Sequence, residues 1–245
     1  MNLVATTKAV LEERLALMAP SRRLRLALAD EILSARLDRS ARLLDAGCGD
    51  GLQTLALAKR HPGWDVLGVD QREDLLRGAR DRARGRGLTN ARFEPADLTV
   101  ALPESDLDAV VALECLSEIP EDRAALAAMT GALRRGGLLV LQVPERDWTP
   151  VIPGSSDAWR EEVRHGYGED ELASMLRDAG LEQIEIRPTY RSLTAAAQEI
   201  RDRIKGAALP VRLAAFPFLA AAVRLERWGL TWGPPSAILA VGRRA

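Results

Sequence analysis

The stretch Leu43-Leu44-Asp45-Ala46-Gly47-Cys48-Gly49-Asp50-Gly51 joins an apolar run to a turn that contains three glycines. The apolar run is typical of a buried strand. Glycine in the turn allows left-handed backbone and lets a ligand approach the main chain closely. A helix beginning near Leu52 would point its N-terminal amides and the positive end of its dipole at the same place. The stretch therefore predicts a site for a nucleotide-like cofactor.

The glycine spacing discriminates between cofactors. A dinucleotide-binding loop, Gly-x-Gly-x-x-Gly, would place its third glycine at position 52, where this chain has Leu52. The pattern acid-x-Gly-x-Gly-x-Gly instead resembles the cofactor loop of class I S-adenosylmethionine-dependent methyltransferases, whose acid helps to hold the amino-acid end of the cofactor. The resemblance implies that this loop binds S-adenosylmethionine through Asp45, Gly47, Cys48, Gly49 and Gly51.

Further signals follow in the order that this family shows. Residues 64–70 read as a second strand ending in Asp70, whose carboxylate can accept both ribose hydroxyls beside Gln71. An acid at that distance also binds ribose in dinucleotide folds, so its spacing alone does not separate the two cofactors. Pro95-Ala96-Asp97-Leu98 resembles the adenine-binding turn, which assigns the adenine to Asp97 and Leu98. The loop after the fourth strand, 107–113, adds Glu114 and Cys115 at the rim of the site.

The alternation of strands and helices over residues 41–143 predicts a parallel, doubly wound α/β sheet with helices on both faces. The resemblance makes it a Rossmann-like, mainly parallel sheet of seven strands, the last antiparallel. Helices are expected over 121–134 and 169–179, and the closing strands over 183–187 and 237–241. The predicted organisation is an N-terminal helical lid segment (1–40), a cofactor-binding core (41–187), a helical insertion (188–236) and a last strand (237–245).

The insertion is unusual, because the family usually joins its last two strands by a tight hairpin and a long connection often has a function of its own. Its run 213–223 is apolar on all sides and too short to cross a bilayer. A helix of that kind is expected to be buried. A substrate lid or a subunit interface is favoured over a membrane surface.

The composition of the chain argues against membrane-spanning, nucleic-acid-binding and metal-binding proteins. The chain has 47% hydrophobic residues, a net charge of -1 and no signal-peptide pattern, which predicts a soluble cytoplasmic protein without stable membrane insertion. The near-zero charge argues against nucleic acid as a partner. Two cysteines and two histidines provide no zinc spacing, so no metal is expected and Cys48 and Cys115 are interpreted as free thiols.

Methyl transfer to oxygen needs a base beside a well-positioned acceptor. His165 is the preferred base, because an unperturbed imidazole titrates near neutrality. Glu118 and Glu145 are weaker alternatives, and Tyr167 is a candidate hydrogen-bond donor to the acceptor. His61 is interpreted as structural.

The resulting hypothesis is a methyltransferase that acts on a small molecule (a natural product, a glycan or a lipid-linked intermediate), with O-methylation preferred. Most aromatic residues follow position 145, which favours a partly apolar acceptor. The alternative is a protein of the same fold that binds S-adenosylmethionine without transferring methyl, as a cyclase-like enzyme or a regulatory subunit. A homodimer is possible, and the sequence does not identify the acceptor.

Overall fold

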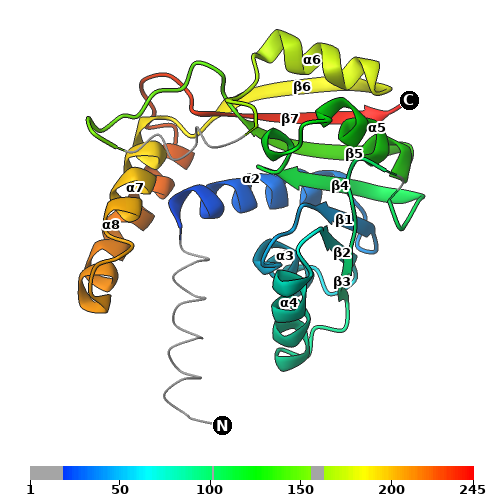
Figure 1. Ribbon diagram of the computed structural model, residues 1–245, viewed down its shortest axis with the longest axis horizontal. Helices are drawn as coiled ribbons and strands as arrows, with labels where there is room; N and C mark the ends of the chain where they lie inside the picture. Colours follow the sequence, from blue (N-terminus) through cyan, green and yellow to red (C-terminus); the bar gives the residue numbers. More distant parts are fainter. Residues whose placement is uncertain (1–18, 101, 156–162) are drawn as a thin grey trace.

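The computed structural model describes residues 19–100, 102–155 and 163–245, which are built around one seven-stranded sheet (Figure 1). The strand order is β3-β2-β1-β4-β5-β7-β6. The strands are β1 (Arg42–Ala46), β2 (Asp65–Asp70), β3 (Ala91–Pro95), β4 (Leu107–Leu113), β5 (Leu133–Pro144), β6 (Leu181–Thr189) and β7 (Ala237–Arg244). Strands β1 to β5 pair in parallel, and β7 is antiparallel to both β5 and β6. The predicted fold class is confirmed.

Helices cover both faces of the sheet. The helices of the described residues are α2 (Pro20–Arg36), α3 (Leu52–Arg60), α4 (Glu73–Gly85), α5 (Asp122–Ala132), α6 (Glu169–Asp178), α7 (Ser192–Arg203) and α8 (Leu209–Arg227), with a short 3-10 turn, η1 (Leu116–Glu118). Apolar side chains of α2, α3 and α4 pack on one face, and those of α5 and α6 on the other. Leu43 joins the first cluster and Leu44 the second, because successive strand residues point to opposite faces. The central strands are therefore apolar on both sides.

The boundary between α5 and β5 differs from the prediction. The helix ends at Ala132 rather than at residue 134, and Leu133 already pairs with Leu107 at the start of β5. Gly136 and Gly137 consequently lie inside the strand instead of after the helix. A Cβ on Gly137 would lie 2.9 Å from the carbonyl oxygen of Leu107, so the close approach of these two backbones requires glycine there.

The insertion forms a helical hairpin, α7 and α8, at one end of the sheet (Figure 1). The two helices pack against each other, and α2 contacts both of them. The expectation that the apolar run 213–223 is buried is wrong for the chain by itself. Leu219, Ala220 and Val223 are buried, whereas 78% of Phe218 is exposed, because α7 and α2 cover one side of α8 only. No helix in the described part of the chain is long and apolar enough to cross a membrane.

Candidate active site

The glycine loop lies at the carboxyl edge of the sheet, between β1 and α3. Gly47, Gly49 and Gly51 all have left-handed backbone, with φ of 70°, 56° and 71°. A Cβ on Gly47 would lie 2.5 Å from Cβ of Cys115, and a Cβ on Gly51 would lie 2.6 Å from Cβ of Ala79. The loop thus requires glycine at positions 47 and 51 both for its backbone conformation and for the space that neighbouring elements leave.

Asp70, at the end of β2, is held by this loop. Its Oδ2 accepts a hydrogen bond from the backbone N–H of Gly49 at 2.8 Å, and its Oδ1 accepts one from the N–H of Arg72 at 2.9 Å. The side chain of Asp70 is 10% exposed. Each carboxylate oxygen can accept a second hydrogen bond, so the loop orients Asp70 and leaves it able to bind a diol.

A cavity opens beside Asp70. Its lining includes six of the predicted cofactor residues and the candidate catalytic residue Glu118. The six are Gly47, Asp70, Gln71, Asp97, Leu98 and Cys115. Residues at the ends of four different strands therefore meet at one hollow, as the carboxyl ends of parallel strands should. We refer to this hollow as the first cavity.

The carboxylate of Asp97 at this cavity is held in place by Thr99. It accepts hydrogen bonds from the Thr99 backbone N–H at 2.8 Å and from the Thr99 hydroxyl at 2.7 Å. These bonds favour the ionised form and lower the pKa of Asp97. An ionised carboxylate is a ready acceptor for an amino group.

Asp45 is close to the glycine loop but is not among the residues that line the first cavity. It is 2% exposed, and its Oδ2 accepts a 2.6 Å hydrogen bond from the Thr54 hydroxyl. Burial raises the pKa of Asp45 to about 6, against the opposing effects of Thr54 and Arg25. Cys48, Gly49 and Gly51 also shape the loop without lining the cavity.

A second cavity is lined from α2, α7 and the residues that follow β4, β5 and β6. Its lining consists of Ser21, Glu114, Pro144, Trp148, His165, Tyr190, Thr194, Ala195, Gln198, Glu199 and Ser236. The first and second cavities are lined by consecutive residues of the loop after β4. Glu114, with a positive φ of 63°, lines the second cavity, whereas its neighbour Cys115 lines the first.

The carboxylate of Glu114 is paired with a residue that the sequence did not indicate. Arg25 of α2 donates from Nη1 to Oε2 of Glu114 at 2.5 Å, and Gln142 donates from Nε2 to Oε1 at 3.2 Å. Burial raises the pKa of Glu114, and Arg25 opposes that shift. Arg22 of the same helix forms an ion pair with Asp50 of the glycine loop at 3.0 Å. Helix α2 therefore links both cavities.

The three predicted catalytic residues separate in the structure. His165 is exposed and lines the second cavity, whereas Glu118 lines the first. Tyr167 lines neither cavity: it is fully buried, and its hydroxyl lies 3.1 Å from Oδ2 of Asp122. Burial and Asp122 raise the pKa of Tyr167, so its phenol serves to hold the chain beneath His165 rather than to exchange protons.

The other residues considered from the sequence are engaged in contacts within the protein or are buried. Glu145 accepts a hydrogen bond from the backbone N–H of Asp147 at 2.7 Å, and its pKa is raised by burial. His61 stacks on Trp64 and lies 2.7 Å from Asp30. Cys115 is buried, which raises the pKa of its thiol to about 12. Residues 19–100, 102–155 and 163–245 include no cluster of three metal-ligating side chains.

Comparisons with known proteins agree with this geometry. Residues 43–137 match the family described as methyltransferase domain. The chain is 35% identical over 125 residues to trans-aconitate 2-methyltransferase of Variovorax paradoxus, a match covering 50% of this chain and 46% of that protein. It is 33% identical over 149 residues to ubiquinone biosynthesis O-methyltransferase of Methylococcus capsulatus, covering 57% of this chain and 62% of that protein. The chain spans about half the length of the curated relatives it matches.

Among solved structures, the [4+2]-cyclase SpnF superposes with a TM-score of 0.64 at 25% identity, over 88% of this chain and 80% of that one. The family match covers the glycine loop, Asp70, Asp97 and the loop after β4. Residues 43–137 are therefore similar to a methyltransferase domain, and the fold around them is the one that class I S-adenosylmethionine-dependent methyltransferases share.

Proposed function

We propose that this protein transfers the methyl group of S-adenosylmethionine to a hydroxyl of a small, partly apolar molecule. The observation that carries the proposal is that two consecutive residues of the loop after β4, Glu114 and Cys115, line two different cavities. A transferase needs donor and acceptor sites that share a boundary, because its two substrates must react directly. The first cavity is the proposed donor site and the second cavity the proposed acceptor site.

The residues of the first cavity suit the donor. Asp70 is the proposed acceptor of both ribose hydroxyls, with Gln71 beside it. Asp97 is the proposed partner of the adenine amino group, and Leu98 covers the ring. Asp45 and the glycine loop are the proposed site of the methionine part, with Glu114 and Cys115 at the rim.

S-adenosylmethionine supplies an electrophilic methyl group whose leaving sulfur needs no acid. The protein's task is then to position the acceptor hydroxyl and to remove its proton. His165 is the proposed base, since it lines the second cavity and an imidazole can accept a proton near neutral pH. Glu118, in the donor cavity, is the weaker alternative. Helices α2 and α7 wall the acceptor site and are the proposed lid.

The charges of the second cavity favour an acceptor without a cluster of carboxylates. Glu114 is neutralised by Arg25. Glu199 accepts hydrogen bonds from the backbone N–H groups of Val151 and Ile152, each at 2.8 Å. The lining contains no Lys or Arg in the described part of the chain. A polyanion such as trans-aconitate would bring further negative charge to this surface without a free cation to pair with.

One polar group of the second cavity is available to an acceptor. Thr194 is fully buried, and no residue in the described ranges 19–100, 102–155 and 163–245 is a hydrogen-bond partner of its hydroxyl oxygen. A buried hydroxyl of this kind costs free energy until it is paired. Together with Trp148, Tyr190 and Ala195 it suits a neutral or amine-bearing acceptor with hydroxyl groups on an apolar frame.

The second candidate is a cyclase-like protein that holds the cofactor without using its methyl group, which the similarity to the [4+2]-cyclase favours. S-adenosylmethionine with an isotope-labelled methyl group, incubated with the protein and a metabolite extract, separates the two. The expected result is a labelled organic-soluble product that is absent for Asp70→Asn. Binding of S-adenosylhomocysteine with no labelled product would favour the cyclase-like function, and rapid labelling of trans-aconitate would refute the proposed acceptor class.

A further inference from the structure

Helix α8 presents a continuous apolar stripe to solvent. Its outward positions follow steps of three and four residues, which is the spacing of one helix face. They are Val211, Ala214, Phe218, Ala221, Leu225 and Trp228. Exposed fractions reach 78% at Phe218 and 81% at Trp228. We call these six residues the α8 stripe.

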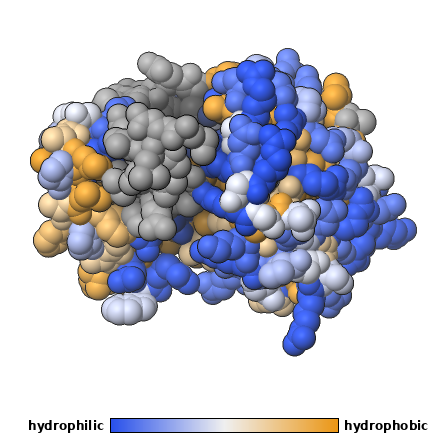
Figure 2. Space-filling view, turned by 90° about the horizontal axis from the view of Figure 1, so that it is seen from below, coloured by the Kyte–Doolittle hydropathy of each residue, from blue (hydrophilic) through white to orange (hydrophobic). Residues whose placement is uncertain are grey.

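The stripe continues beyond the helix. Leu230 and Trp232, in the loop toward β7, are 53% and 55% exposed. In Figure 2 hydrophobic surface gathers on the side of the molecule where α7 and α8 lie. Exposed apolar residues scattered singly are ordinary, but a contiguous patch with two tryptophans marks a surface that binds something.

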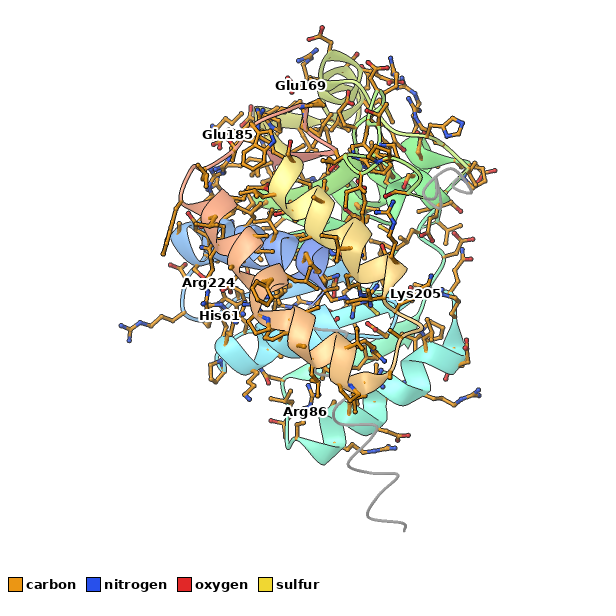
Figure 3. The ribbon with its side chains drawn as sticks, turned by 90° about the vertical axis from the view of Figure 1, so that its left-hand side faces the viewer. His61, Arg86, Glu169, Glu185, Lys205 and Arg224 are labelled. Carbon is orange, nitrogen blue, oxygen red and sulfur yellow. The ribbon has the colours of Figure 1, made fainter. Side chains whose placement is uncertain are left out.

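The segment that carries the stripe has more basic than acidic residues. Residues 192–236 contain six basic and three acidic residues, a net charge of +3 in a chain whose total is -1. Two of the acids, Glu199 and Glu226, are buried, and Glu226 accepts hydrogen bonds from the backbone N–H groups of Arg191 and Thr194. Arg224 and Lys205 lie at opposite ends of the hairpin face that Figure 3 displays. No acidic side chain belongs to the stripe itself.

We propose that the α8 stripe binds the surface of a membrane that contains anionic lipids. Trp, Phe and Leu side chains enter the boundary between headgroups and acyl chains, while flanking arginines pair with lipid phosphates. A second copy of this chain fits less well. A two-fold contact through the stripe would bring the basic residues of one copy against those of the other, and like charges across an interface oppose association.

The location of the stripe gives this contact a consequence. Helix α7 packs against α8 and also contributes Thr194, Ala195, Gln198 and Glu199 to the second cavity. Docking through α8 would therefore place the lipid against the helix that packs on α7, one of the walls of that cavity. An acceptor that partitions into the membrane would reach the cavity without crossing bulk water.

The test is co-sedimentation of the full chain with vesicles of phosphatidylcholine alone or with a quarter of phosphatidylglycerol. Binding to the anionic vesicles is expected to be at least about tenfold tighter and to weaken in high salt. Phe218→Ser with Trp228→Ser should lower the binding to both vesicles by at least about tenfold. Arg212→Glu with Arg224→Glu should remove the preference for phosphatidylglycerol. Val100→Ser, at an exposed apolar residue outside the hairpin, is the matched control and should leave binding unchanged.

Two results would overturn the proposal. One is equal, weak sedimentation of the wild type and all variants with both vesicles. The other is a dimer, measured by analytical ultracentrifugation without lipid, that the Phe218 and Trp228 substitutions dissociate, since the stripe would then bind a second copy. Thermal unfolding and binding of S-adenosylhomocysteine check the fold of each variant independently of any methyl transfer.

Discussion

At the scale of single residues, His165 is the proposed proton acceptor. His165→Ala should lower kcat by about two orders of magnitude, which is the usual contribution of a general base. Because a protonated imidazole cannot accept a proton, the wild-type kcat should fall toward acid pH and the variant should lack that dependence. Steady-state kinetics with the acceptor found by isotope transfer measure both effects.

The chain's other histidine provides the control. His61 stacks on Trp64 at the end of α3 and lines neither of the two cavities of the proposed active site. His61→Ala should leave kcat and its pH dependence unchanged. An equal loss of kcat in both variants would assign His165 a structural role and return Glu118 to consideration as the base.

Asp45 gives a prediction about pH. Burial raises its pKa to about 6, so the unliganded protein takes up a proton at this carboxylate as the pH falls through 6. If ionised Asp45 pairs with the ammonium group of the cofactor, the affinity for S-adenosylhomocysteine should fall about tenfold per pH unit below 6. Calorimetric titration from pH 8 to pH 5 measures this slope.

Asp45→Asn should bind S-adenosylhomocysteine weakly at every pH, because its amide carries no charge. The raised pKa of Asp45 also affects the stability of the unliganded protein, but in the direction opposite to its effect on the affinity for S-adenosylhomocysteine. Since the folded-state pKa is above the ordinary 3.8, ionisation of Asp45 costs stability as the pH rises from about 4 to about 6. A wild-type affinity that is flat from pH 5 to pH 8 would exclude Asp45 from the ammonium site.

The site residues that could be predicted from the sequence are those whose type is required by the local backbone and by close neighbours. Gly47 and Gly51 must be glycine because of their backbone and their neighbours, and Asp70 must follow a strand to reach the loop. Arg25 and Glu199 were missed because neither belongs to a motif. Their importance comes from pairing across the fold, between Arg25 and Glu114 and between Glu199 and the chain at 151–152.

At the scale of elements, the contact between α2 and the loop after β4 depends on one ion pair. The Arg25 and Glu114 side chains are 12% and 11% exposed. Removing one partner of a buried pair leaves an uncompensated charge, so Arg25→Met should cost about 3 kcal/mol of unfolding free energy. The loss should shrink toward acid pH, because Glu114, whose pKa burial already raises, then takes up a proton.

Denaturant unfolding of a small set of variants measures this contribution. Arg25→Met combined with Glu114→Gln should recover most of the lost stability, since no charge then remains buried. Arg36→Met is the matched control on the same helix. Its partner Glu185 is half exposed, and a surface pair of this kind contributes less than about 1 kcal/mol. Equal losses for Arg25 and Arg36 would show that the pair with Glu114 is no stronger than a surface pair.

Helices and strands could be predicted from the sequence where a periodic pattern of apolar residues was followed by residues that typically end such an element. The five parallel strands follow apolar runs, and α6 ends one residue before the predicted limit of 179. The end of α5 and the burial of α8 were not predictable in this way. Leu133 joins a strand because Leu107 lies opposite it. In the described part of the chain α8 packs mainly against α7 and α2, which leaves its other side exposed. Both facts depend on distant parts of the chain.

At the scale of the whole molecule, the proposed cofactor site is formed by elements from α2 to the loop after β4. Binding of S-adenosylhomocysteine should therefore stabilise the entire fold. S-adenosylhomocysteine at a hundredfold excess over its Kd should add about 2.7 kcal/mol to the unfolding free energy. For a chain of this size that corresponds to a rise in Tm of about 5 to 10 °C. Differential scanning fluorimetry measures the shift.

NADH at the same concentration should give no shift in Tm, because Leu52 replaces the third glycine of a dinucleotide loop. Asp70→Asn should abolish most of the shift with S-adenosylhomocysteine and should also lower the Tm of the unliganded protein, because the amide nitrogen cannot accept the hydrogen bond that Oδ1 of Asp70 accepts from the N–H of Arg72. The amide oxygen still accepts the hydrogen bond from Gly49 that orders the loop, whereas the charge that accepts the ribose hydroxyls is gone. A full shift in Asp70→Asn would place the ribose elsewhere, and a shift with NADH would contradict the roles proposed for the glycine loop.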